Sequence, residues 1–239
     1  MSDNERKHDY TIEIDATPEQ VWEAIATAAG VASWFAPIVR VEPGEGGSMY
    51  IEWGPGMGYT QRIDVWEPNS HLRVSGDRGE GAPPIVVDYY VETKGGHTVL
   101  RLVHSGFGPE ASFDGEYEAT GAAWPVFLKM LKHSAEQGVG RCRNITVFRV
   151  LEVPRDESWA RILAADPFEG GKVWHNSKSI ACVNYPARRN DLLSIFCEKC
   201  GGSTMLTIAN LLYGATDAEA DAVRTQWSNF VDGLFGKAE

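Results

Sequence analysis

The sequence predicts an α+β protein in which a curved antiparallel sheet packs against a long helix, followed by a second, reduced α+β unit of similar plan. Short segments of alternating apolar and polar residues are separated by Gly- and Pro-rich turns, which is typical of antiparallel strands. A long amphipathic segment follows at 113–137. A shorter succession of the same kind fills the rest of the chain. We therefore predict two domains, residues 1–139 and residues 140–239.

The chain is expected to begin with a strand and a helix. Residues 8–15 alternate as a half-buried strand does. Thr17 and Pro18 predict the N-cap and first turn of a helix, because Pro tolerates the first helical position. Gly30 is expected to end this helix, and residues 31–37 then form a short second helix.

The next segments predict further strands, so that residues 8–105 hold six or seven in all. The expected strands are 38–42, 48–53, 59–67, 71–76, 85–93 and 97–105. Their hairpin-length connections predict an antiparallel meander. The long helix presents Trp124 and Phe127 on its apolar face. We expect this helix to cover one face of the sheet and to leave a cavity beneath it.

Residues 140–239 predict a shortened repeat of this plan. The spacing of Trp124, Phe127, Leu128 and Leu131 recurs as Trp227, Phe230, Val231 and Leu234. An internal duplication explains the match, although amphipathic helices can reuse Trp and Phe by chance. A shorter sheet should enclose less space, so we expect no comparable cavity here. Its exposed edge predicts an apolar interface with the first domain or with a second copy.

Composition and charge restrict the partners. The chain has 239 residues, 43% of them hydrophobic, and a net charge of −11. The acidic excess lies in the first domain and would repel a phosphate backbone, so we expect no nucleic-acid partner. The sequence shows neither a membrane-spanning apolar run nor the pattern of a signal peptide. We therefore expect a cytoplasmic protein.

Four cysteines raise the question of a metal or redox site. Cys142 and Cys182 are isolated, whereas Cys197 and Cys200 form a C-x-x-C that is expected at a hairpin tip. A structural zinc site needs a second pair of ligands, and none stands out. We predict free thiols and no metal or cofactor, while a metal knuckle or redox pair at Cys197 and Cys200 stays open.

Several sequence strings resemble a known superfamily. IDATPEQVWEAI, SWFAP, VEPGEGG and GAAWPVFLKMLKHSAEQG occur in order within residues 8–138. They resemble the SRPBCC (START-like) superfamily, and within it the branch named after the activator of the heat-shock-protein ATPase. The resemblance implies a helix-grip fold, a sheet curled around its last helix. It does not imply one function, because the superfamily includes lipid carriers, hormone receptors, polyketide cyclases and a co-chaperone module.

Strand parity and the position of the final helix indicate which side chains face the expected cavity. The candidate ligand-binding residues are Trp34, Phe35, Trp53, Gln61, Tyr89, His104, Trp124 and Phe127. This aromatic and sparsely polar set is typical of a pocket for a hydrophobic molecule, although a solid core uses the same residue types. His104 is the ionisable group expected to face the helix, either to bond a ligand carbonyl or to act as an acid or base.

Three functions are compatible with these residues. Binding or carriage of a small hydrophobic molecule is the leading prediction. A co-chaperone-like interaction module is the first alternative, and a cyclase- or hydratase-type enzyme acting through His104, Gln61 and Tyr89 is the second. No catalytic residue is assigned. A homodimer and a protein partner both stay open.

Overall fold

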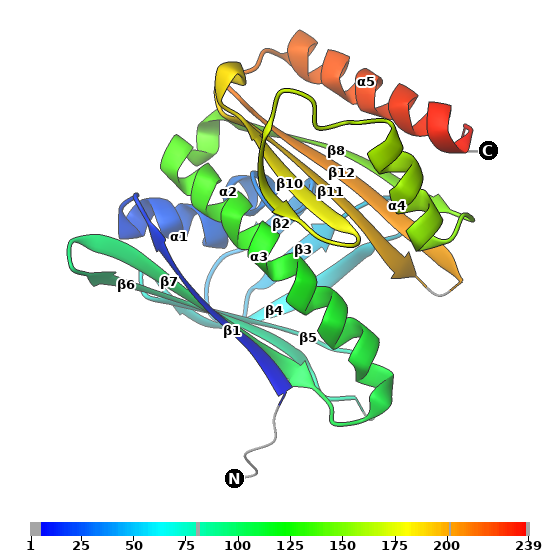
Figure 1. The fold of residues 1–239 in the computed structure, drawn as a ribbon. Coiled ribbons are helices and arrows are strands. Elements are labelled where there is room, and N and C mark those ends of the chain that lie inside the picture. The colour runs from blue at the N-terminus through cyan, green and yellow to red at the C-terminus, as the bar shows by residue number, and fades with distance from the viewer. Residues whose placement is uncertain (1–5, 80–81, 201, 238–239) are drawn as a thin grey trace. The chain divides into compact units, whose positions relative to one another are not determined.

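The computed structural model describes residues 6–79, 82–200 and 202–237 (Figure 1). The chain divides into two compact units, Met1–Gly140 and Arg141–Glu239. Each has its own antiparallel sheet and its own final helix. The predicted α+β, helix-grip fold class is thus confirmed.

The first unit has a seven-stranded sheet in its described residues, with the order β1-β7-β6-β5-β4-β3-β2. Every neighbouring pair is antiparallel, as the short connections predicted. The elements are β1 (Arg6–Ile14), α1 (Pro18–Ala26), α2 (Ala28–Ala32), β2 (Ile38–Glu42), β3 (Ser48–Glu52), β4 (Gly58–Glu67), β5 (His71–Gly76), β6 (Ile85–Lys94), β7 (His97–Phe107), the 3₁₀ turn η1 (Ala111–Phe113) and α3 (Asp114–Gln137).

Helix α1 begins as its sequence predicted. The Thr17 hydroxyl accepts the Gln20 N–H, and the Gln20 side chain accepts the Thr17 N–H, which completes a capping box before Pro18. The prediction that Gly30 ends this helix was wrong. Gly30 lies inside α2, where a Cβ would come within 1.9 Å of the Glu23 carbonyl oxygen. Glycine is therefore present for close packing of the two helices, and the second helix ends before residues 33–37.

A proline inside α3 helps to fix this helix on the sheet. Pro125 has no N–H, so the carbonyl of Gly121, four residues earlier, lacks its usual helical partner. The Tyr10 hydroxyl of β1 donates to that carbonyl at 3.1 Å. The Gly121 carbonyl, which Pro125 leaves without a helical partner, thus accepts a hydrogen bond from β1.

The second unit repeats this topology with fewer strands. Its sheet has the order β8-β12-β11-β10-β9, and in both units the first strand pairs with the last. The 3₁₀ turn η2 (Val139–Arg141) crosses the boundary between the units. The elements that follow are β8 (Cys142–Leu151), α4 (Arg155–Ala164), β9 (Lys172–Asn176), β10 (Ile180–Tyr185), η3 (Pro186–Arg188), β11 (Asp191–Cys200), β12 (Ser203–Tyr213) and α5 (Asp217–Phe235). Helices α4 and α5 both pack on this sheet.

Candidate functional site

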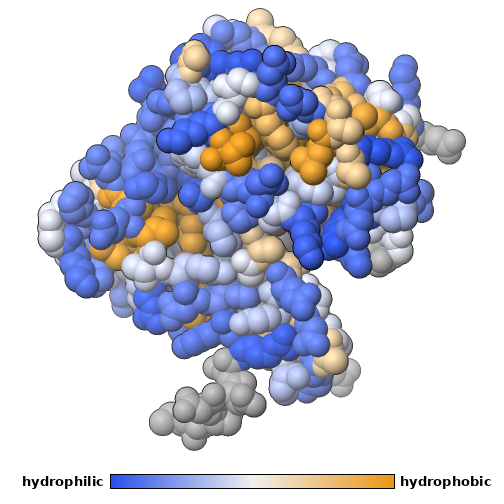
Figure 2. Space-filling view, in the orientation of Figure 1, coloured by the Kyte–Doolittle hydropathy of each residue, from blue (hydrophilic) through white to orange (hydrophobic). Residues whose placement is uncertain are grey.

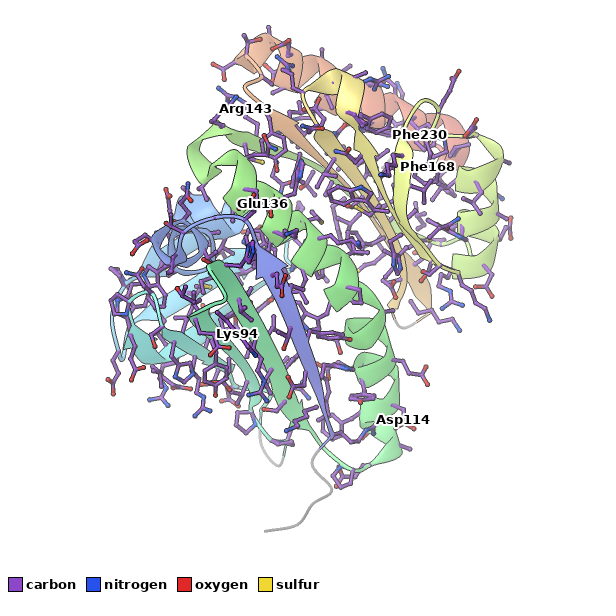
Figure 3. All side chains as sticks on the ribbon, turned by 60° about the vertical axis from the view of Figure 1, so that its left-hand side comes forward. Lys94, Asp114, Glu136, Arg143, Phe168 and Phe230 are labelled. Atoms are coloured by element: carbon purple, nitrogen blue, oxygen red, sulfur yellow. The ribbon has the colours of Figure 1, made fainter. Side chains whose placement is uncertain are left out.

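A cavity of about 400 Å³ lies between the sheet and α3 of the first unit. Its wall is mostly apolar and comes from α1, α2, α3 and strands β3 to β7. Figure 3 shows α3 from its start at Asp114 to Glu136 near its end, with Lys94 at the end of β6. The curled sheet and the helix thus leave space that the side chains between them do not fill.

Aromatic rings close one side of this cavity. Phe35 stacks on Trp124 with the ring centroids 6.1 Å apart and the planes at 9°. It also contacts Phe127, at 4.8 Å, and Trp34, at 5.0 Å. Figure 2 shows hydrophobic side chains in patches bordered by hydrophilic residues on the viewed face.

The structure brings seven of the eight predicted site residues to the cavity wall: Trp34, Phe35, Gln61, Tyr89, His104, Trp124 and Phe127. Trp53 is not among the lining residues. Strand β3 ends at Glu52, so strand parity no longer determines where the next side chain points. Trp53 packs instead against Phe35 and Phe127, at 4.7 and 5.5 Å between ring centroids. The role of these residues in binding remains a prediction.

His104 makes one hydrogen bond that fixes its tautomer. The indole Nε1 of Trp124 donates to its Nδ1 at 2.8 Å. Indole N–H only donates, so Nδ1 is the acceptor and the proton of the neutral ring is on Nε2. Burial lowers the pKa of His104 to about 3, helped by the nearby charges of His8 and Arg78. The ring is therefore neutral, and its Nε2 is buried with no hydrogen-bond partner among the described residues.

Arg78 is a cavity residue that the sequence did not single out. Its Nη2 donates to Glu116 Oε1 at 2.6 Å, while its Nη1 is buried without a partner in the described part of the chain. The guanidinium lies near the rings of Phe107, at 5.7 Å, and Phe113, at 5.5 Å. Arg78 follows the end of β5, where no periodic pattern indicates the direction of a side chain.

His8 was also missed, although it lies on the first predicted strand. Its ring stacks on Tyr117 at 4.2 Å, and its Nε2 is 2.9 Å from the Tyr117 carbonyl and 3.1 Å from Thr120 Oγ1. Burial lowers its pKa, although the bond to the Tyr117 carbonyl opposes the effect. His8 thus helps to hold α3 against β1.

The second unit also has a cavity, of about 600 Å³. The prediction that this unit lacks a comparable space was wrong, because α5 and the segment before β9 enclose it although the sheet is shorter. The wall includes the aromatic residues Tyr185, Trp227 and Phe230 and the polar residues Asn210 and Asp191. Phe230 is labelled in Figure 3.

Cys142, Cys182 and Cys197 are reduced thiols. The expected hairpin tip lies where β11 ends at Cys200, but Cys197, which was predicted at this tip, does not lie there. Cys197 is fully buried in the interior of β11, and burial raises the pKa of its thiol to about 12. Burial raises the pKa of Cys142 to about 12 as well. The side chain of Cys200 lies outside the described residues. Among those described, no three His, Cys, Asp or Glu side chains form a group that could hold a metal ion. None of the described helices is both long and apolar enough to span a bilayer.

Three solved structures show what the chain is similar to. Protein MLL2253 from Mesorhizobium loti is 23% identical with a TM-score of 0.49, over 54% of this chain and 95% of that one. The Aha1 dimer from Colwellia psychrerythraea is 22% identical with a TM-score of 0.47, over 55% and 96%. DynU16, from the dynemicin biosynthetic locus, is 18% identical with a TM-score of 0.46, over 92% and 93%. No curated protein matches the sequence.

The family itself is shown by the sequence of the first unit. Residues 15–136, about half of the chain, match the family described as "Activator of Hsp90 ATPase homolog 1-like protein". The match covers the segment from the end of β1 to the end of α3, which encloses the first cavity. The chain therefore belongs to the Activator of Hsp90 ATPase homolog 1-like protein family, within the SRPBCC superfamily.

Proposed function

We propose that the first unit binds a small hydrophobic molecule in the cavity between its sheet and α3. The main support is the cavity itself, about 400 Å³ with a mostly apolar wall. Ligand sites are typically concave, apolar and equipped with a few placed polar groups, and His104, Gln61 and Tyr89 are such groups here. The ligand would gain its affinity mainly from the apolar area removed from water.

Binding is favoured over catalysis by the state of His104. A general acid or base works best with a pKa near the operating pH. Burial lowers the pKa of His104 to about 3, so at neutral pH the ring is a poor proton acceptor. Tyr89 is equally unsuited, because burial raises its pKa above the ordinary value. A cyclase- or hydratase-type enzyme is therefore the weaker proposal.

Interaction with a larger ATPase is the second candidate, and the family's description supports it. In the first unit Ile38 and Tyr59 are large apolar side chains that remain 45% and 42% exposed, although Tyr59 also lines the first cavity. They lie on β2 and β4, which are not neighbours in the sheet. Single exposed apolar residues are ordinary on protein surfaces, so this support is limited.

The binding proposal can be tested by filling the cavity. Ala123 of α3 lines the cavity, whereas its neighbour Ala122 is exposed. Titration with N-phenyl-1-naphthylamine, an apolar dye that fluoresces when buried, should give saturable binding to the natural protein. Ala123→Phe should weaken this binding at least about tenfold, which is about 1.4 kcal/mol. Ala122→Phe is the matched control and should bind as before. Equal binding by both folded variants would contradict the proposal.

A further inference from the structure

The first cavity has two buried hydrogen-bond donors that no described protein group satisfies. One is Nε2–H of His104 and the other is Nη1 of Arg78. Both residues line the cavity. Buried donors without a partner are uncommon in native proteins, and each such group calls for an explanation. A bound molecule that accepts hydrogen bonds would provide one.

We propose that the hydrophobic ligand has a neutral carbonyl oxygen and that this oxygen accepts a hydrogen bond from Nε2 of His104, with Arg78 Nη1 as a second donor. The inference rests on the proposed binding function and names the chemical class of the ligand. It assigns recognition of the ligand's carbonyl oxygen to His104 and Arg78.

The donor character of His104 follows from its contact with α3. Trp124 occupies Nδ1 as the donor, at 2.8 Å, so the remaining ring nitrogen holds the proton. The residue is 3% exposed. Its unpartnered ring nitrogen can therefore donate a hydrogen bond to a ligand but cannot accept one. An ammonium group, which only donates, would not satisfy it.

The charges on the wall favour a neutral acceptor over an anion. Arg78 is already paired with Glu116 at 2.6 Å. Glu116 and Asp77 also line the cavity, so the charged residues of the wall are two carboxylates and one guanidinium. A carboxylate on the ligand would gain from Arg78 and be repelled by the other two. A carbonyl oxygen has two lone pairs and no charge, so it can accept from both donors without this repulsion.

Two matched probes can isolate the contribution of the carbonyl group to the affinity of a ligand. 2-Acetylnaphthalene and 2-isopropenylnaphthalene have the same shape, but a CH₂ group replaces the oxygen in the second. Their affinities are measured by displacement of N-phenyl-1-naphthylamine. In His104→Phe the affinity ratio of ketone to alkene should fall about 3- to 10-fold, the usual size of one hydrogen bond. Arg78→Met should lower the ratio in the same direction.

The controls distinguish this inference from the binding proposal. If the alkene binds the natural protein but the ratio is unchanged in both variants, the carbonyl inference is wrong and the cavity proposal stands. If the dye itself does not bind the natural protein, the cavity proposal fails. 2-Naphthoate tests the charge argument, because it should bind more weakly than the ketone, and tighter binding would overturn the choice of a neutral group. The carbonyl stretching frequency of bound ketone, labelled with ¹³C, should be lower in the natural protein than in His104→Phe.

Discussion

Trp124 and His104 are joined by a buried hydrogen bond, 2.8 Å from indole Nε1 to imidazole Nδ1. The bond connects α3 to β7 at the wall of the first cavity. It positions both rings, fixes the tautomer of the histidine and leaves its Nε2–H without a hydrogen-bond partner among the described residues. The stability of the first unit and the proposed recognition of a carbonyl therefore depend on the same contact.

Changing Trp124→Phe should remove this bond and keep most of the apolar packing. His104 Nδ1 would then lose its partner, which costs about 1–3 kcal/mol for a buried polar group. Trp124→Ala should cost about 3–5 kcal/mol, because the apolar contacts are lost as well. Chemical denaturation followed by circular dichroism measures both. Equal losses for Phe and Ala would show that packing contributes little here.

The stability of the protein should depend on pH through His104. Its pKa is about 3 in the folded chain and has the ordinary value of 6.5 when unfolded. As the pH falls below 6.5, the unfolded chain binds a proton that the folded ring does not, so the free energy of unfolding decreases. One such group lowers it by about 1.4 kcal/mol per pH unit, or about 2 kcal/mol between pH 8 and pH 5.

The matched variant for this measurement is His104→Gln, whose amide oxygen can accept from Trp124. The variant should lose this part of the pH dependence between pH 8 and pH 5. His8, whose pKa is also lowered, contributes with the same sign in both proteins. Identical slopes for the two proteins would contradict the assignment to His104.

The bond between Tyr10 and the Gly121 carbonyl should depend on Pro125. Tyr10→Phe removes the hydroxyl that donates to this carbonyl at 3.1 Å and should cost about 1 kcal/mol. In Pro125→Ala the restored N–H of residue 125 can reach the same carbonyl, so the cost of Tyr10→Phe should be smaller. A double-mutant cycle of unfolding free energies measures the difference. Additive effects would mean that the proline and the tyrosine act independently.

Asp191 should make the stability of the second unit depend on pH with the opposite sign to His104. Its carboxylate accepts the Tyr213 N–H at 3.0 Å, and burial raises its pKa. The raised pKa means that ionisation disfavours the folded state, so stability decreases as the pH rises through the folded value. Asp191→Asn keeps an acceptor without charge and should equal or exceed the natural protein in stability at pH 7. A loss as large as that of Asp191→Leu at pH 7 would contradict this account.

Local patterns predicted the regular elements better than the site. Strand parity is a property of two-residue repeats, so it correctly placed Gln61, Tyr89 and His104 on the inner face. It failed at Trp53, where the strand had already ended. Arg78 could not be predicted, because it follows a strand end and its direction depends on the distant Glu116. Side chains outside regular elements are positioned by long-range contacts that a sequence pattern does not encode.

In the second unit, too, the sequence predicted the regular elements better than the cavity. The spacing of Trp227 and Phe230 correctly indicated a helix on a sheet, and the indole of Trp227 donates to Asn210 Oδ1 on β12 at 3.0 Å. Trp124 donates to His104 on β7 in the same manner. An internal duplication would account for both contacts and remains a prediction. The enclosed space in this unit was not predictable, because it depends on how the segment before β9 folds.

The central claim is that a hydrophobic molecule binds beneath α3. Two-dimensional ¹H–¹⁵N NMR of the tryptophan indole groups tests it most directly, because Trp124 lines the first cavity and Trp227 lines the second. Titration with N-phenyl-1-naphthylamine should shift the Trp124 indole resonance saturably and leave that of Trp227 in place. A titration in which the Trp124 resonance stays unchanged, or in which the Trp227 resonance alone shifts, would contradict the account.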